Sequence, residues 1–230
     1  MKISEINKIV IFGFPHCGTT ILRNILGHCE QIKELLNEPA FVKQASESHK
    51  YTLCKTPFPI NLCEYEDYVK IMILRNPVYV FSSLNKRFKN KDEPNHTLDD
   101  YISALKLFDS IKHGKNNTYK LIYSDMFKNN YLQIRNILAD IDIQYDDRIF
   151  NNSLWENKFW WNIKYSDIKE KPTYRNAVTD KDNLWNYRTY QINQEFKNFN
   201  KKNAVSLTPS QVKIIKNSKI INKYFDTSTI

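Results

Sequence analysis

The sequence has 230 residues, of which 41% are hydrophobic and 26% are charged, a composition typical of a soluble globular protein. No apolar run approaches the roughly 20 residues that a membrane-spanning helix needs, so we expect no membrane partner. The formal net charge of +9 favours an anionic ligand or surface. The amino terminus shows no signal-peptide pattern, and we therefore expect a cytoplasmic protein.

The four cysteines form neither a Cys-x-x-Cys pair nor a cluster with the spacing of metal ligands. We expect reduced thiols that pack inside the protein, and we expect no metal site. The cysteines are Cys17, Cys29, Cys54 and Cys63.

Residues 8–27 contain the pattern around which the chain is organised. A strand is predicted over 9–14 and a helix over 19–28, with a glycine-bounded turn between them. A strand, a glycine loop and a helix start together direct backbone N–H groups toward a phosphate. A Walker loop has Gly-Lys-Ser/Thr at its end, whereas residues 18–20 are Gly-Thr-Thr. The loop therefore resembles a nucleotide-phosphate loop without its lysine.

Strands and helices alternate along the following hundred residues. This alternation predicts a single α/β domain with a P-loop-like parallel sheet flanked by helices, and ligands bind such sheets at the carboxyl ends of the strands. The predicted elements are a polar helix or turn over 30–37, a helix over 39–46, a strand over 51–55, a brief helix over 62–67, a strand over 69–74, helices over 78–89 and 99–112, a strand over 119–123 and a helix over 131–139.

Three side chains suited to anion binding stand at predicted strand ends, at Lys55, Arg75 and Tyr123. Ser83 and Arg87 lie four residues apart on the helix that follows Arg75, so they share one helix face. Together with Arg75 they could present two guanidinium groups and a hydroxyl to one dianion. The alternative is a pair of surface arginines.

Beyond residue 150 the sequence becomes rich in aromatic and asparagine residues and loses its periodicity. We expect residues 151–230 to be loops and short helices that cover the nucleotide-binding core, 1–150, within one domain. A last helix is predicted from Thr208 to Tyr224. The aromatic side chains either stack on an acceptor or pack over the sheet.

Taken in order, these motifs resemble those of sulfotransferases that use 3′-phosphoadenosine 5′-phosphosulfate (PAPS). Residues 14–20, Phe-Pro-His-Cys-Gly-Thr-Thr, are similar to the family's phosphosulfate loop, and residues 73–77, Ile-Leu-Arg-Asn-Pro, are similar to its 3′-phosphate motif. Residues 53–58 and 121–125 resemble segments of the tyrosylprotein and carbohydrate members. The resemblance covers roughly residues 8–128.

The resemblance implies the sulfotransferase fold and transfer of a sulfuryl group from PAPS to an acceptor hydroxyl, without a metal. Glu38 stands where those members carry a glutamate, which makes it the expected general base; the alternative is an exposed loop residue. The implied catalytic residues are Glu38, Lys55 and His16, and the implied cofactor-binding residues are Pro15, His16, Cys17, Gly18, Thr19, Thr20, Arg75, Ser83, Arg87, Tyr123 and Arg175.

Three departures from the family pattern bear on this interpretation. His16 replaces the usual loop cation, and it is either a cation, a neutral donor or an ordinary loop residue. Cys17 replaces a serine. Pro57 stands where the small-molecule branch carries a catalytic histidine, which disfavours the phenol and steroid type of acceptor. The Glu38-Pro39 context and the tryptophans favour a carbohydrate acceptor first, and residues 54–58 favour a tyrosine second, with a small-molecule hydroxyl as a further alternative.

Other classes of protein remain as alternatives. A P-loop nucleotide kinase is disfavoured because the loop has no lysine and because Arg75-Asn76 stands where such enzymes place a magnesium-binding aspartate. A non-catalytic nucleotide-binding protein is a further alternative. No nucleic-acid partner is expected, since the lysines are scattered and no recognition motif is present.

Overall fold

The structure is a computed structural model of the chain. It describes residues 7–35, 48–88, 94–150, 206–228 and 230, and the backbone of 159–160 and 163–164. The side chains of residues 86 and 87 are not among the described parts.

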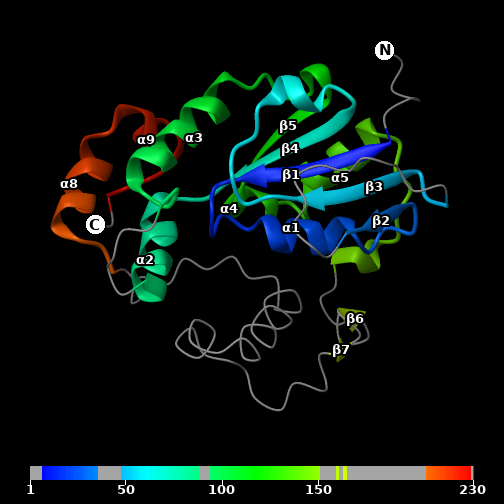
Figure 1. Ribbon diagram of the computed structural model, residues 1–230, viewed down its shortest axis with the longest axis horizontal. Helices are drawn as coiled ribbons and strands as arrows, with labels where there is room; N and C mark the ends of the chain where they lie inside the picture. The colour runs from blue at the N-terminus through cyan, green and yellow to red at the C-terminus, as the bar shows by residue number, and fades with distance from the viewer. Residues whose placement is uncertain are drawn as a thin grey trace.

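Five parallel strands form one sheet in the order β2-β3-β1-β4-β5. The central strand, β1 (Lys8–Gly13), pairs with β3 (Tyr51–Lys55) on one side and β4 (Tyr68–Leu74) on the other. The outer strands are β2 (Ile32–Glu34) and β5 (Thr118–Ile122). Figure 1 shows β1 in the middle of the sheet. All five carboxyl ends therefore lie at one edge.

Helices cover both faces of this sheet. One core lies between the sheet, α1 and α5, and the other lies between the sheet, α2, α3, α8 and α9. In Figure 1, α3 and α9 lie side by side. The helices are α1 (Thr19–Leu26), α2 (Pro77–Phe88), α3 (Leu98–Ser110), α4 (Tyr123–Met126), α5 (Leu132–Asp140), α8 (Pro209–Asn217) and α9 (Lys219–Tyr224), and the 3₁₀ turns are η2 (Leu62–Tyr65), η3 (Lys115–Asn117) and η4 (Asp147–Phe150).

The residues of β1 explain why the apolar run is continuous. Ile9 and Ile11 belong to the core on the α1 side, whereas Phe12 belongs to the core on the α2 side. All three are fully buried. A parallel strand with helices on both faces has no solvated side, and its sequence is apolar throughout.

Most of the predicted elements are confirmed, together with the parallel α/β fold flanked by helices. The prediction of a helix or turn over 30–37 was wrong in part, because Ile32–Glu34 is an edge strand that pairs with β3. The last helix divides at Ser218, whose hydroxyl accepts a hydrogen bond from the Ile221 amide and caps α9. Tyr123 opens α4 instead of ending β5.

The carboxyl-terminal part is described only in pieces. Two short strands, β6 (Phe159–Trp160) and β7 (Ile163–Lys164), pair antiparallel, and α8 and α9 pack on the α2 side of the sheet. The predicted helix 39–46 and most of the predicted cover lie outside the described residues. The division of a single domain, 1–230, into a core and a cover therefore stays a prediction.

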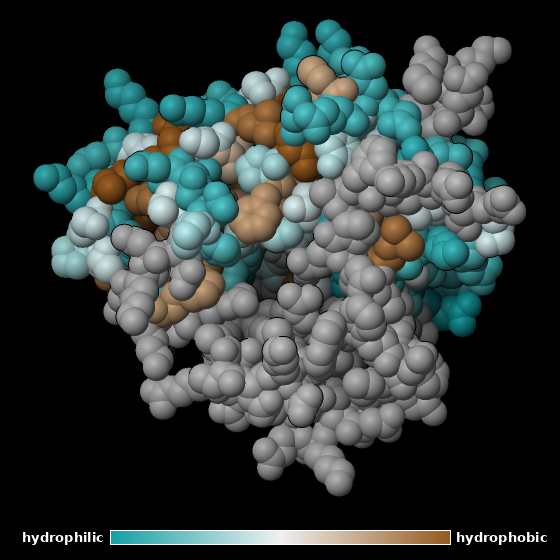
Figure 2. Space-filling view, in the orientation of Figure 1, coloured by the Kyte–Doolittle hydropathy of each residue, from teal (hydrophilic) through white to brown (hydrophobic). Residues whose placement is uncertain are grey.

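Within the described ranges, no helix is long and apolar enough to cross a bilayer. Figure 2 shows a mainly hydrophilic surface on the described part of one face. Among the residues that the structure describes, the exposed large apolar side chains are Phe58, Leu132 and Ile214. The cytoplasmic location stays a prediction.

Candidate functional site

The loop between β1 and α1 starts and ends with glycine for two different reasons. A Cβ atom on Gly13 would lie 2.1 Å from the Ile73 carbonyl oxygen of β4, so only glycine lets the two strands approach. Gly18 has φ 99°, a left-handed conformation that glycine adopts without steric cost. Gly18 is the N-cap of α1, and no side chain provides a cap hydrogen bond there. The amino end of α1 is thus built from backbone amides.

Cys17 anchors this loop in the interior. Its side chain is fully buried, and its amide donates a hydrogen bond of 3.1 Å to the Phe14 carbonyl. Burial raises the pKa of the Cys17 thiol to about 12, although a hydrogen bond with the Arg75 backbone and the Arg75 charge act in the opposite direction. The thiol is therefore neutral near pH 7. Since the Cys17 amide is used within the turn, the amides from Gly18 onward are the ones left to consider for a ligand.

Arg75 stands immediately after β4 and is bracketed by two aromatic rings. Its guanidinium carbon lies 4.5 Å from the centre of the Tyr123 ring and 5.6 Å from the centre of the Tyr79 ring. The Tyr101 hydroxyl donates a hydrogen bond of 2.7 Å to the Arg75 carbonyl. Cation–π contacts of this kind fix the direction of a guanidinium group. Burial raises the pKa of Tyr123, opposed by the Arg75 charge, so the ring stays neutral.

Tyr123 also contacts the loop. A Cβ atom on Gly18 would lie 2.4 Å and 2.6 Å from two carbons of the Tyr123 ring. The same ring therefore touches both the amino end of α1 and the guanidinium of Arg75. We call Gly18, Arg75 and Tyr123 the phosphate-edge cluster.

His16 joins the loop to α2. Its Nδ1 atom lies 2.7 Å from Oγ of Ser83, and both side chains are half-buried. His16 has φ 65°, a left-handed backbone that places the residue at the turn of the loop. His16 and Ser83, which the resemblance predicts at opposite ends of a nucleotide, are thus in direct contact.

Lys55 ends β3 at the same edge of the sheet. Its side chain is buried, with 2% exposed, and β3 pairs it with Ile11 of the central strand. The following amide, that of Thr56, donates a hydrogen bond of 2.8 Å to the Ile11 carbonyl. A buried lysine therefore lies one strand away from the loop.

The structure describes most of the predicted site residues. Pro15 and Thr19 are buried and Thr20 is half-buried, all at the β1–α1 connection. Glu38 and Arg175 lie outside the described residues, and so does the side chain of Arg87, which belongs to α2. The role of each predicted residue stays a prediction.

Sequence reasoning missed the residues that hold Arg75. Tyr79 lies four positions after Arg75, a spacing that could have signalled its contact across the first turn of α2. Tyr101 lies in α3, and nothing in its sequence context distinguishes it from an ordinary core residue. It is fully buried, and burial raises its pKa well above the ordinary value.

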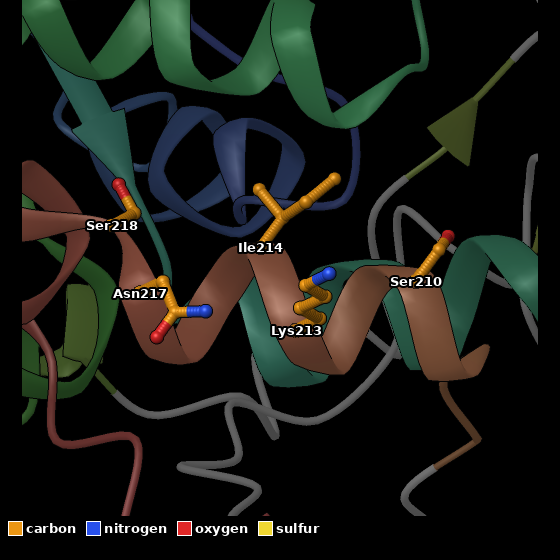
Figure 3. A pocket seen from close by; sticks show the side chains of 5 residues that line it. All are labelled: Ser210, Lys213, Ile214, Asn217 and Ser218. Atoms are coloured by element: carbon orange, nitrogen blue, oxygen red, sulfur yellow. The ribbon is translucent and has the colours of Figure 1, made fainter.

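Metal ligands and hollows away from this site are the other features that could bind a ligand in the described part. No group of three His, Cys, Asp or Glu residues that could hold a metal ion is present in it. A hollow lies along α8 and the residue that follows it, and none of the predicted site residues lines it; Figure 3 shows its side chains. The hollow is lined by Ser210, Lys213, Ile214, Asn217 and Ser218.

Comparison with solved structures identifies the fold. The chain is similar to the crystal structure of mouse sulfotransferase SULT7A1 complexed with PAP, with a TM-score of 0.53 and 15% sequence identity. The similarity covers 94% of this chain and 86% of the mouse chain. No protein-family model and no curated protein matches the sequence. The similarity shows that the two chains share the sulfotransferase fold.

Proposed function

We propose that this protein transfers a sulfuryl group from PAPS to a hydroxyl of a carbohydrate or glycoconjugate. The observation that carries the proposal is the phosphate-edge cluster. In this cluster the Tyr123 ring contacts both the amino terminus of α1 and the Arg75 guanidinium. A helix amino terminus attracts anions through its amides and its dipole. Such an arrangement suits a nucleotide that carries separate anionic groups at its 3′ and 5′ positions.

The shared fold adds to this argument. SULT7A1 was crystallised with PAP, the bisphosphate that remains when PAPS has given up its sulfuryl group. The residues present here fit that ligand, because Gly18 leaves the amino end of α1 without a side-chain cap and Arg75 is held at the adjacent strand end.

Each residue has a role in the proposal. The amides of residues 18–20 stabilise negative charge at the 5′ side, with Lys55 and His16 as the nearby basic groups. Arg75, Ser83 and Arg87 bind the 3′-phosphate. PAPS supplies the activated sulfuryl group.

The remaining assignments rest on the resemblance. Glu38 accepts the proton of the acceptor hydroxyl as general base. Arg175 belongs to the segment that covers the cofactor. The carbohydrate acceptor is supported by the Glu38-Pro39 context and by the tryptophans between residues 155 and 185, whose rings suit the apolar faces of sugars.

The test separates cofactor binding from transfer. In Glu38→Gln we expect PAP to bind as in the wild type, measured by calorimetry, while transfer from labelled PAPS falls about 10²- to 10⁴-fold because the base is lost. Glu30→Gln, which changes an exposed glutamate outside the site, is the matched control and keeps transfer. Unchanged transfer in Glu38→Gln contradicts the role of Glu38.

The acceptor is identified by offering the wild-type protein labelled PAPS with oligosaccharides, tyrosine peptides and small phenols in parallel. Label in the oligosaccharides supports the proposal. Label in the peptides or phenols alone overturns the carbohydrate assignment and leaves sulfuryl transfer standing.

A further inference from the structure

The contact between His16 and Ser83 connects two parts of the site through a single hydrogen. Nδ1 of His16 and Oγ of Ser83 are 2.7 Å apart, a distance at which one hydrogen lies between them. His16 lies in the loop before α1, and Ser83 lies 67 positions later in α2. Either group is able to donate that hydrogen, because an imidazole nitrogen and a hydroxyl each act as donor or acceptor.

Counting hydrogens shows what a bound phosphate does to this pair. A serine hydroxyl has one hydrogen to donate, whereas the oxygens of a phosphate dianion only accept. If Ser83 donates to a phosphate, it has no hydrogen left for His16. Two lone pairs would then face each other across 2.7 Å unless Nδ1 carries the hydrogen.

We propose that binding of the cofactor's 3′-phosphate by Ser83 fixes a hydrogen on Nδ1 of His16. His16 is then a positioning residue, which donates to Ser83 and directs the Ser83 hydroxyl toward the phosphate. The inference rests on the proposed function, since it takes a 3′-phosphorylated nucleotide as the ligand. It holds for a neutral ring with its hydrogen on Nδ1 and for the imidazolium alike.

The pair also connects the two ends of the nucleotide. His16 belongs to the loop that the proposed function assigns to the 5′ side, and its left-handed backbone fixes the position of its side chain at the turn. Occupation of the 3′ position therefore orders the ring of a residue in the 5′ loop. An arginine or lysine in place of His16 would always be a donor and could not respond in this way.

The direct test is the hydrogen position on the His16 ring. Nitrogen-15 shifts of the ring nitrogens, assigned among the five histidines by comparison with His16→Asn, distinguish a protonated from an unprotonated Nδ1. In wild-type protein saturated with PAP we expect a protonated Nδ1. An unprotonated Nδ1 in the PAP complex overturns the inference.

Matched variants give a second readout that does not depend on spectroscopy. The amide nitrogen of asparagine can replace Nδ1 as a donor, and asparagine tolerates the left-handed backbone, whereas glutamine reaches farther and resembles Nε2. The readout is the ratio of the affinities for PAP and for AMP, which lacks the 3′-phosphate. A variant that weakens the binding of both nucleotides equally leaves this ratio unchanged, so the ratio reports only the contribution of the 3′-phosphate.

We expect His16→Asn to keep the ratio and His16→Gln and Ser83→Ala each to lower it about tenfold or more, the usual effect of losing a hydrogen bond to a charged group. The double variant His16→Gln with Ser83→Ala loses no more than either single one. A ratio that stays at the wild-type value in His16→Gln overturns the inference alone. Absence of PAP binding by the wild-type protein overturns the proposed function, and the inference with it.

Discussion

The guanidinium carbon of Arg75 lies 4.5 Å from the centre of the Tyr123 ring, and that ring also fills the space beside Gly18. Arg75 follows β4, Tyr123 follows β5, and Gly18 precedes α1. Parallel strands bring these three connections to one edge of the sheet. A single buried ring thus fixes the distance between the amino end of a helix and a guanidinium group.

Replacement of Tyr123 by leucine removes the cation–π contact with Arg75. Because such contacts contribute roughly 0.5–2 kcal/mol, we expect the affinity for PAP to fall about 2- to 30-fold. Tyr123→Phe, which keeps the ring, is the matched control and binds PAP more tightly than the leucine variant. Calorimetric titration measures both, and equal affinities in the two variants would show that the ring does not position Arg75.

Gly18 and Gly114 offer a paired test of the contact with Tyr123. Both have positive φ, 99° and 76°, but a Cβ atom meets the Tyr123 ring only at Gly18 and meets nothing within 4 Å at Gly114. Gly114→Ala should cost about 1–2 kcal/mol from the left-handed backbone and leave PAP binding unchanged. Gly18→Ala should lower the free energy of unfolding further and weaken PAP binding at least tenfold, because the ring or the loop must move.

Thermal melts and PAP titrations of the two alanine variants provide the comparison. If Gly18→Ala loses no more stability and no more affinity than Gly114→Ala, the contact between the loop and Tyr123 is not part of the binding site.

The parts of the fold predicted from sequence are those with local signals. The apolar run of β1 and the proline that starts α2 could be identified from periodicity and capping rules alone. The strand β2 could not be identified in this way, because it has only three residues and because its Glu34 is buried in an ion pair with Arg23 of α1. A partner distant in sequence decided the structure there.

The site follows the same division. The loop glycines and the strand-end cations were predicted because parallel topology places strand ends together. Three contacts were not predicted: the Tyr79 ring beside the Arg75 guanidinium, the hydrogen bond from Tyr101 to the Arg75 carbonyl, and the contact between His16 and Ser83. Side-chain pairing across elements depends on helix packing, which the sequence pattern does not specify.

The buried ion pair between Arg23 and Glu34 joins β2 to α1, in addition to the pairing of β2 with β3. The two groups are 2.9 Å apart, and their side chains are 1% and 5% exposed. Removal of one partner leaves a buried charge, so Arg23→Met should lower the free energy of unfolding by roughly 3–5 kcal/mol. The double variant Arg23→Met with Glu34→Leu should recover most of that loss. Urea unfolding measures both, and a double variant as unstable as the single one would contradict this account.

The buried thiols should make stability fall at high pH. Burial raises the pKa of Cys17, Cys29 and Cys54 from the ordinary 9.0 to about 12. Between these values the folded protein keeps protons that the unfolded chain has lost, so the free energy of unfolding decreases as pH rises. The decrease amounts to at most about 1.4 kcal/mol per pH unit for each thiol.

Unfolding measured between pH 8 and pH 10.5 tests this pH dependence. Cys29→Ala should show a shallower decrease than the wild type, whereas Cys63→Ala, which removes an exposed thiol, should follow the wild-type slope. An unchanged slope in Cys29→Ala would mean that this thiol ionises as readily in the folded protein as in the unfolded chain.

The central claim is that the site binds a nucleotide 3′,5′-bisphosphate rather than a magnesium nucleoside triphosphate. Thermal unfolding of the wild-type protein with PAP in EDTA, and separately with ATP and Mg²⁺, tests it most directly. A ligand present at 100 times its dissociation constant adds about 2.7 kcal/mol to the stability of the folded state. We predict that PAP in EDTA raises the midpoint temperature of unfolding and that ATP with Mg²⁺ leaves it unchanged. A midpoint raised by ATP with Mg²⁺ but not by PAP would contradict the account.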